Sequence, residues 1–145
     1  MGFWGLILFF LRRDAFTEIF LTPNLAGNFV KALHMDLIKK SKKRAFEVTL
    51  TADDVMDCWK RQKGMCALSA EPMMHSSVHN AVSPFLNTTI DRIDMSKPYS
   101  RQNCHLVCAR ASQSKGEMGV EEYVGLCRKV TRQTDKRVTR RASFP

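Results

Sequence analysis

The stretch 87–115, NTTIDRIDMSKPYSRQNCHLVCARASQSK, constrains the fold of this chain more than any other segment. Polar and apolar residues alternate over 89–93, a turn follows at 96–98, and a second apolar run occupies 104–108. Two such runs joined by a turn predict a β-hairpin. The next residues, 109–115, are polar and compatible with a helix. The segment therefore predicts a strand, turn, strand and helix in that order, with donors for one hard cation.

Four features of this stretch resemble the ββα-metal finger, or His-Me finger, of HNH endonucleases. They are the motif DRID at 91–94, the polar turn 96–99, Asn103 and Lys115. In that family the first strand carries Asp-His, the second begins with Asn, and the helix carries Asn or His followed three residues later by Lys. Asp91, Asn103 and Lys115 match the Asp, the Asn and the Lys.

Two positions depart from the family pattern. Arg92 stands where the general-base His is found, and Ser112 stands where the helical Asn or His completes the metal site. A branch common in phages and large DNA viruses also has Asp-Arg-Ile-Asp here. The segment CALSAEPM at 66–73 resembles a Cys-Ala-Leu-Ser/Thr-Gly-x-Pro-Met segment of that branch, and EEYVGLCRK at 121–129 resembles its closing helix.

The resemblance implies a small α+β domain of the ββα-metal type, with a two-stranded hairpin flanked by helices. We expect an apolar N-terminal segment at 1–23, an HNH-like domain at 24–131 with its finger core at 87–118, and a basic tail at 132–145. Between positions 128 and 141 the chain has seven cations and one acid. Such a composition buries little apolar surface, so we expect this end to be frayed or disordered.

Two helices are predicted before the hairpin. Apolar residues recur every four positions along 24–46, at Leu25, Phe29, Leu33 and Leu37. A second helix is expected to begin at Thr51 as N-cap, with acids in its first turn, and to stop at Gly64.

The resemblance implies a metal-dependent DNA endonuclease that hydrolyses phosphodiester bonds, with Mg²⁺ or another divalent cation as cofactor. Asp91 is the expected metal ligand, and Ser112 offers a second, neutral oxygen. Asn103 is expected to tie the hairpin loop and orient the site. Arg92 and Lys115 are expected to contact phosphate.

The general base is the open position in this site. Arg92 cannot deprotonate in a protein, so it clamps a phosphate rather than abstracting a proton. His105 is the first candidate base, because it lies two residues after Asn103 and therefore on the same strand face. His75 and His79 are the other two candidates.

Zinc is not expected. Cys66 begins a Cys-x-x-Ser and Cys108 begins a Cys-x-x-Ala, where many HNH proteins have Cys-x-x-Cys twice and hold a structural zinc. A site built from Cys66, Cys104, His105 and Cys108 is the alternative to small thiols buried in the core.

The charge of the chain favours a polyanionic partner. The 145 residues include 23 Lys and Arg against 14 Asp and Glu, a formal charge of +9. DNA is the expected partner, and RNA is the alternative. The cations expected to contact nucleic acid are Arg92, Lys97, Lys115, Lys39, Lys40, Lys42, Lys43, Arg44, Arg137, Arg140 and Arg141.

Cysteine usage and the N-terminus bear on location. Five scattered cysteines predict free thiols in a reducing, intracellular compartment. The apolar run 2–11 is shorter than the roughly 20 residues of a membrane span, so no transmembrane helix is expected. It is interpreted as a segment packed on the domain, with attachment to a membrane surface through this run as the alternative.

Two other functions are compatible with the sequence. One is a catalytically degenerate finger that binds nucleic acid without cutting it, which the departures at Arg92 and Ser112 favour. The other is a structural component of a larger nucleoprotein assembly. Retention of Asp91 and Asn103 argues against the second, because a purely structural role requires neither residue.

Overall fold

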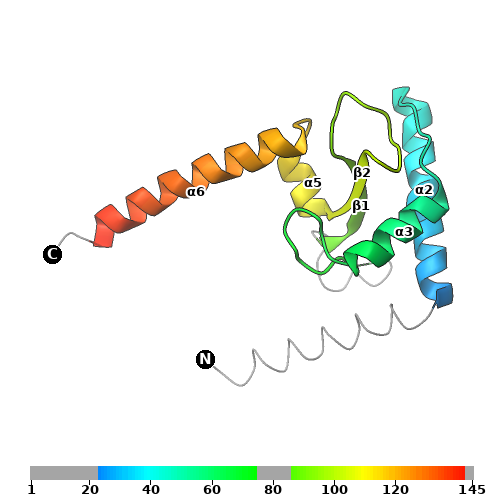
Figure 1. The fold of residues 1–145 in the computed structure, drawn as a ribbon, viewed down its shortest axis with the longest axis horizontal. Helices are drawn as coiled ribbons and strands as arrows, with labels where there is room; N and C mark the ends of the chain where they lie inside the picture. The colour runs from blue at the N-terminus through cyan, green and yellow to red at the C-terminus, as the bar shows by residue number, and fades with distance from the viewer. Residues whose placement is uncertain (1–22, 75–85, 143–145) are drawn as a thin grey trace, which may run out of the picture.

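The computed structural model describes residues 23–74 and 86–142, with side chains within 26–74 and 86–137. These residues form four helices and one two-stranded antiparallel sheet, so the domain is α+β. In Figure 1 the hairpin lies between the helices, and α6 extends away from them. The elements are α2 (Pro23–Arg44), α3 (Ala52–Gln62), β1 (Thr88–Arg92), β2 (Cys104–Cys108), α5 (Ala109–Lys115) and α6 (Val120–Ala142).

Helix α2 confirms the apolar period of the sequence. Phe29 and Leu37 are buried, and Leu33 packs against the core from the same side. The helix ends at Arg44 rather than Phe46, because Ala45 adopts a left-handed backbone conformation with φ 54°. Its cationic last turn complements the negative end of the helix dipole.

Helix α3 begins as the sequence predicts. The Thr51 hydroxyl accepts a hydrogen bond from the Asp54 backbone N–H at 3.1 Å, and Asp54 accepts from the Thr51 N–H at 3.0 Å. This reciprocal pair satisfies two N–H groups that the first turn leaves without helical partners. The bond from the Thr51 N–H, together with one from the Thr51 hydroxyl to Asp54 Oδ2 at 2.7 Å, holds the pKa of Asp54 below its usual value. At the other end Lys63, with φ 52°, caps the helix immediately before the predicted stop at Gly64.

The hairpin has two strands as predicted, although β1 begins and ends one residue earlier than the expected range 89–93. Its antiparallel register pairs Asp91 with His105 and Ile90 with Leu106. Because side chains alternate along a strand, Asp91 and His105 share one face of the sheet, and Ile90 and Leu106 share the other. Leu106 packs in the core with residues from α2 and α3. The Gln62 side chain bonds both the N–H of Leu106, at 2.9 Å, and its carbonyl, at 2.8 Å.

Helix α5 covers the hairpin, and α6 follows it after a short turn. The Val120 N–H donates to the Ile93 carbonyl at 2.9 Å, which anchors the start of α6 to the end of the first strand. The expectation that the chain is frayed or disordered from Arg128 onward is wrong, because α6 continues to Ala142. The predicted boundary between domain and tail, at 131/132, falls inside this helix.

No helix of the described residues is long and apolar enough to cross a membrane. The predicted apolar segment at 1–23 lies almost entirely outside the described residues.

Candidate metal and nucleic-acid site

A buried charged cluster lies on the α5 side of the hairpin. Asp91, only 7% exposed, has its Oδ2 atom 3.2 Å from His105 Nε2 and 3.3 Å from Lys115 Nζ. The strand register brings His105 opposite Asp91, and the last turn of α5 carries Lys115 back to the same carboxylate. Three of the predicted site residues therefore converge.

Lys115 does not have the position that the sequence predicted for it. Its side chain is completely buried, and Nζ donates to the Met118 carbonyl at 2.6 Å and contacts Met95 Sδ at 3.5 Å. Its expected role as a phosphate contact is corrected, because an ammonium with no exposed surface does not reach a phosphate in solvent. Lys115 instead neutralises Asp91 and ties α5 to the loop that follows it. A buried charge requires such a partner.

Asn103 organises the loop between the strands. Its Oδ1 atom accepts from the Asp94 N–H at 2.9 Å, and its Nδ2 atom donates to the carbonyls of Asp94 at 2.9 Å, Pro98 at 3.0 Å and Lys97 at 3.3 Å. The Asn103 side chain is buried, so these bonds replace those it would make to water. They confirm the predicted role of tying the loop.

Arg92 is held between two aromatic rings. Its guanidinium carbon lies 5.2 Å from the ring centre of Phe46 and 4.9 Å from that of Tyr99. One end donates to the Lys97 carbonyl at 3.2 Å, while Nε is buried with no hydrogen-bond partner among the described residues. Burial raises the pKa of Tyr99 against the opposing effect of Arg92. Arg92 is thus oriented by stacking, and contact with phosphate stays a prediction.

A cleft of about 400 Å³ runs along β1 between α2 and α5. Asp91 and Ser112, the two predicted metal ligands, both line it. Arg92 lines it as well, as do Lys40 and Arg44 from α2. Lys40 is paired with Asp36, also in the cleft wall, at 2.6 Å. The fold therefore places the Asp91 carboxylate and the Ser112 hydroxyl in one opening with three cations, and with two further carboxylates, those of Asp36 and Glu117.

The remaining predicted cations lie elsewhere. Lys97 is exposed and pairs with Asp94 at 3.0 Å. Three further predicted cations of α2, Lys39, Lys42 and Lys43, are exposed, and so is Arg137 on α6. The side chains of Arg140 and Arg141 lie outside the described residues.

The donors in the cleft fit a hard divalent cation held by few protein ligands. Both contacts of Asp91 use Oδ2, and no hydrogen bond or ion pair engages Oδ1 within the described chain. The described residues contain no group of three or more His, Cys, Asp or Glu placed to hold a metal. A Mg²⁺ ion keeps several waters, so it needs few protein ligands, and the Asp91 carboxylate and the Ser112 hydroxyl are ligands of a suitable type. The Lys115 ammonium competes for the same carboxylate.

His105 is the candidate base that contacts Asp91, but it does not line the cleft along β1 and instead faces residues of α3. Its side chain is 12% exposed, and Nε2 contacts Asp91, which leaves Nδ1 as the other ring nitrogen. His75 and His79 lie outside the described residues. His34, which the sequence analysis passed over, has Nε2 2.7 Å from the Leu50 carbonyl and so links α2 to the chain before α3.

The cysteines do not assemble the alternative metal site. Cys66 Sγ accepts from the Cys108 N–H at 3.3 Å, so these two lie together as the resemblance implied. His105 is on the opposite strand face from Cys104 and Cys108, next to Asp91, so the four proposed ligands do not converge. Burial raises the pKa of Cys104 to about 12, which keeps it a thiol.

Comparison with protein-family models and with curated protein sequences finds no match to this chain. Any proposal about function therefore rests on the geometry of the site.

Proposed function

We propose that this chain is a metal-dependent DNA endonuclease of the HNH type, built on a ββα-metal finger, which hydrolyses phosphodiester bonds. The observation that carries the proposal is the cleft along β1. There the predicted ligands Asp91 and Ser112 share one opening with Arg92, Lys40 and Arg44. A carboxylate able to hold a cation, with cationic side chains nearby to contact a phosphate, is an arrangement that supports phosphodiester hydrolysis.

The residues have separate roles in this proposal. Asp91 and Ser112 hold a divalent cation, which when bound stabilises charge on the phosphate and activates a water. Lys40 and Arg44 attract the strand to the cleft. Asn103 keeps the loop, and with it β1, in place. His105 is oriented by Asp91, and in this proposal its other ring nitrogen accepts a proton, which requires access to the cleft that His105 does not itself line.

A second function is favoured by one specific observation. The Lys115 ammonium lies 3.3 Å from Asp91 Oδ2 and already neutralises the carboxylate without any metal. This ion pair gives Asp91 a structural role in a binding module, so the presence of Asp91 does not by itself require catalysis. The alternative is therefore a nucleic-acid-binding protein that does not cut.

The test is cleavage of supercoiled plasmid DNA by the full chain with Mg²⁺ or Mn²⁺. Asp91→Asn is the main variant, because it preserves the shape of the side chain, and its far-UV circular dichroism is measured as well because it leaves Lys115 buried without its carboxylate. Ser112→Ala, which keeps that ion pair, is the second variant. Asp94→Asn is its matched control, since Asp94 is exposed on the loop and does not line the cleft. We expect a loss of roughly a hundred-fold or more in rate for Asp91→Asn, little change for Asp94→Asn, and no cleavage in EDTA.

Two outcomes would contradict the nuclease proposal. The first is cleavage that survives both EDTA and Asp91→Asn, which would indicate a contaminating enzyme. The second is an absence of cleavage with plasmid retardation that persists in Asp91→Asn and weakens with salt. That result would support the binding module.

A further inference from the structure

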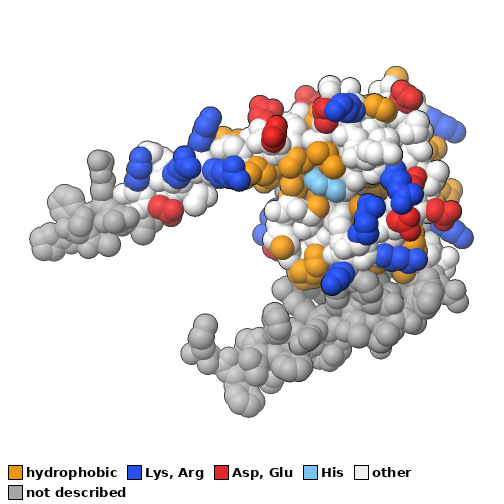
Figure 2. Space-filling model, in the orientation of Figure 1, with side chains coloured by type: hydrophobic (Ala, Val, Ile, Leu, Met, Phe, Trp, Pro, Cys, Tyr) orange, Lys and Arg blue, Asp and Glu red, His pale blue; other side chains and the backbone are white. Residues whose placement is uncertain are grey.

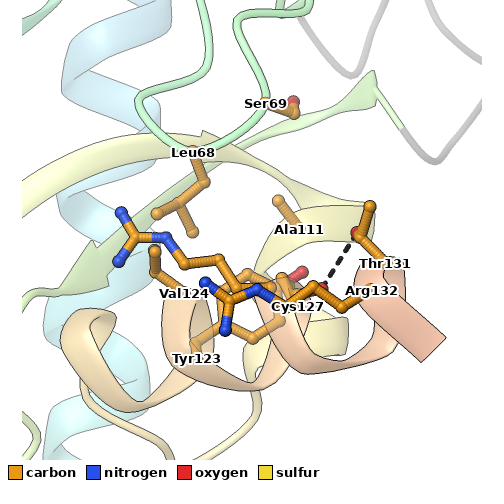
Figure 3. Close-up of a pocket in the computed structure, with 9 residues that line it drawn as sticks. Leu68, Ser69, Ala111, Tyr123, Val124, Cys127, Thr131 and Arg132 are labelled. Carbon is orange, nitrogen blue, oxygen red and sulfur yellow. Dashed lines mark hydrogen bonds between the residues drawn. The ribbon is translucent and has the colours of Figure 1, made fainter. Parts of the chain in front are cut away.

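A groove separate from the cleft lies between α6, α5 and the turn that follows Cys66. Its volume is about 440 Å³, within the range of small-ligand pockets. Figure 3 shows Leu68 pointing from the turn toward α6, with Tyr123, Val124 and Cys127 on the helix side. The groove floor is largely apolar, and none of its residues lines the cleft along β1.

The rim of this groove is cationic. Arg128 and Arg132 line it from successive turns of α6, and Lys136 continues the row one turn further. Residues four apart on a helix lie about 6 Å apart along its axis. Glu71, in the same turn as Leu68, is paired with Arg110 at 2.8 Å and does not offset these charges. Figure 2 shows Lys and Arg side chains following one another along the projecting part of α6.

The distribution of apolar residues on α6 distinguishes between partners. All side chains from 126 to 137 are exposed, yet from 128 to 137 Val130 is the only large apolar one. A protein that packed along α6 would find almost no apolar surface beyond the groove. A nucleic-acid strand needs only one pocket for a flat base and repeated cations for its phosphates.

The Tyr123 ring is fixed in a position to receive a base. Its hydroxyl donates to Ser114 Oγ at 3.0 Å, which holds the ring against α5 while the ring lines the groove. Stacking of a base on an aromatic side chain is tolerant of sequence, because every base has a π-face.

We propose that this groove binds an unpaired nucleotide of a nucleic-acid strand. The base enters between Leu68 and Tyr123, and the flanking phosphates contact Arg128, Arg132 and Lys136. The proposal rests on the proposed function for the identity of the partner as nucleic acid, but it does not require cleavage. It adds that the substrate or partner has an unpaired strand next to the domain.

The test is fluorescence anisotropy of the full chain with a labelled single-stranded oligonucleotide and with its duplex, both in EDTA. The first variant is Arg128→Gln with Arg132→Gln. Its matched control is Lys129→Gln with Lys60→Gln, which removes the same charge from exposed positions outside the groove. We expect the first pair to weaken single-strand binding about ten-fold or more, and the control pair to weaken it about two- to three-fold.

A second variant tests the base contact. Tyr123→Leu keeps apolar volume but removes the aromatic face, and Ser114→Ala controls for the lost hydrogen bond. We expect Tyr123→Leu to weaken single-strand binding about five-fold or more, with duplex binding almost unchanged and Ser114→Ala close to the unmodified protein.

Three results would overturn the groove proposal. The first is equal weakening by the two charge pairs, which would show a general electrostatic effect. The second is equal loss of single-strand and duplex binding in Tyr123→Leu. The third is competition by polyglutamate as strong as that by the oligonucleotide at equal charge, which would indicate an acidic protein partner. None of these results depends on plasmid cleavage. Failure of the groove proposal is therefore distinguishable from failure of the nuclease proposal, which the cleavage assay with Asp91→Asn tests.

Discussion

Lys115 and Lys136 carry the same ammonium group in opposite surroundings. Lys115 is 0% exposed and contacts Asp91, Met118 and Met95, whereas Lys136 is exposed on the projecting part of α6. The buried lysine is part of the framework of the candidate site, while the exposed one is available to a partner. The chain thus separates the charges that hold the fold from the charges that face solvent.

This difference explains why charge alone is a poor guide to binding residues. A cation at the surface contributes little to the free energy of unfolding, and it can exchange water for a phosphate at a small cost in free energy. A buried cation that loses its carboxylate has no water to replace it. Removing either member of a buried ion pair therefore destabilises the whole fold. The two lysines therefore predict opposite mutational results.

The largest effect is expected for Lys115→Ala. The change leaves the Asp91 carboxylate buried with only His105 as partner and opens a cavity, so we expect a loss of about 3–5 kcal/mol in the free energy of unfolding. Lys136→Ala, the matched exposed change, should shift it by no more than about 0.5 kcal/mol. Urea denaturation followed by far-UV circular dichroism measures both. A loss below about 1 kcal/mol in Lys115→Ala would contradict the framework role.

A double variant sharpens this comparison. Asp91→Asn removes the charge that Lys115→Ala leaves unpaired, so the two changes together should cost less than the sum of their separate costs. Additive costs would show that packing of the Lys115 stem, rather than the ion pair, dominates.

An intermediate effect is expected for Asn103→Ala. The variant leaves the Asp94 N–H and two or more loop carbonyls without their buried partner, so we expect a loss of about 2–4 kcal/mol. Gln102→Ala is the neighbouring control, because Gln102 is exposed, and it should be near neutral. The same urea titrations compare the two. Equal stability of both variants would show that water replaces the Asn103 bonds without cost.

The sequence predicted the parts of the fold that local chemistry determines. The strands, the Thr51 cap and the α2 period each depend on residues a few positions apart, and alternation, capping and helical spacing are visible at that range. Asn103 was assigned correctly to the loop through the resemblance. The loop bonds themselves are also short-range, since Asn103 and Asp94 are nine positions apart.

The long-range features were not predictable from the chain. Arg92 stacks on Phe46, which lies 46 positions earlier, and nothing near Arg92 marks that contact. The burial of Lys115 follows from how α5 folds back on β1, which also depends on tertiary packing. The error at α6 has another cause. A lack of apolar residues does not imply a lack of structure here, because Arg, Lys and Gln are good helix formers and Glu121 and Glu122 favour the first turn.

The smallest effect concerns Asp94, whose backbone belongs to the Asn103 network but whose carboxylate lies at the surface. Hydrogen bonds from Ser96 and Lys97 lower the pKa of Asp94 to about 2 from its usual 3.8. A depressed pKa in the folded state stabilises the protein above pH 3.8, and this contribution disappears as the pH falls through about 2. Asp94→Asn should therefore be less stable than the unmodified protein at pH 5, and the difference should shrink between pH 4 and pH 2. Urea midpoints of both proteins across that range measure it. A difference that stays constant down to pH 2 would mean that ionisation of the Asp94 carboxylate does not stabilise the fold.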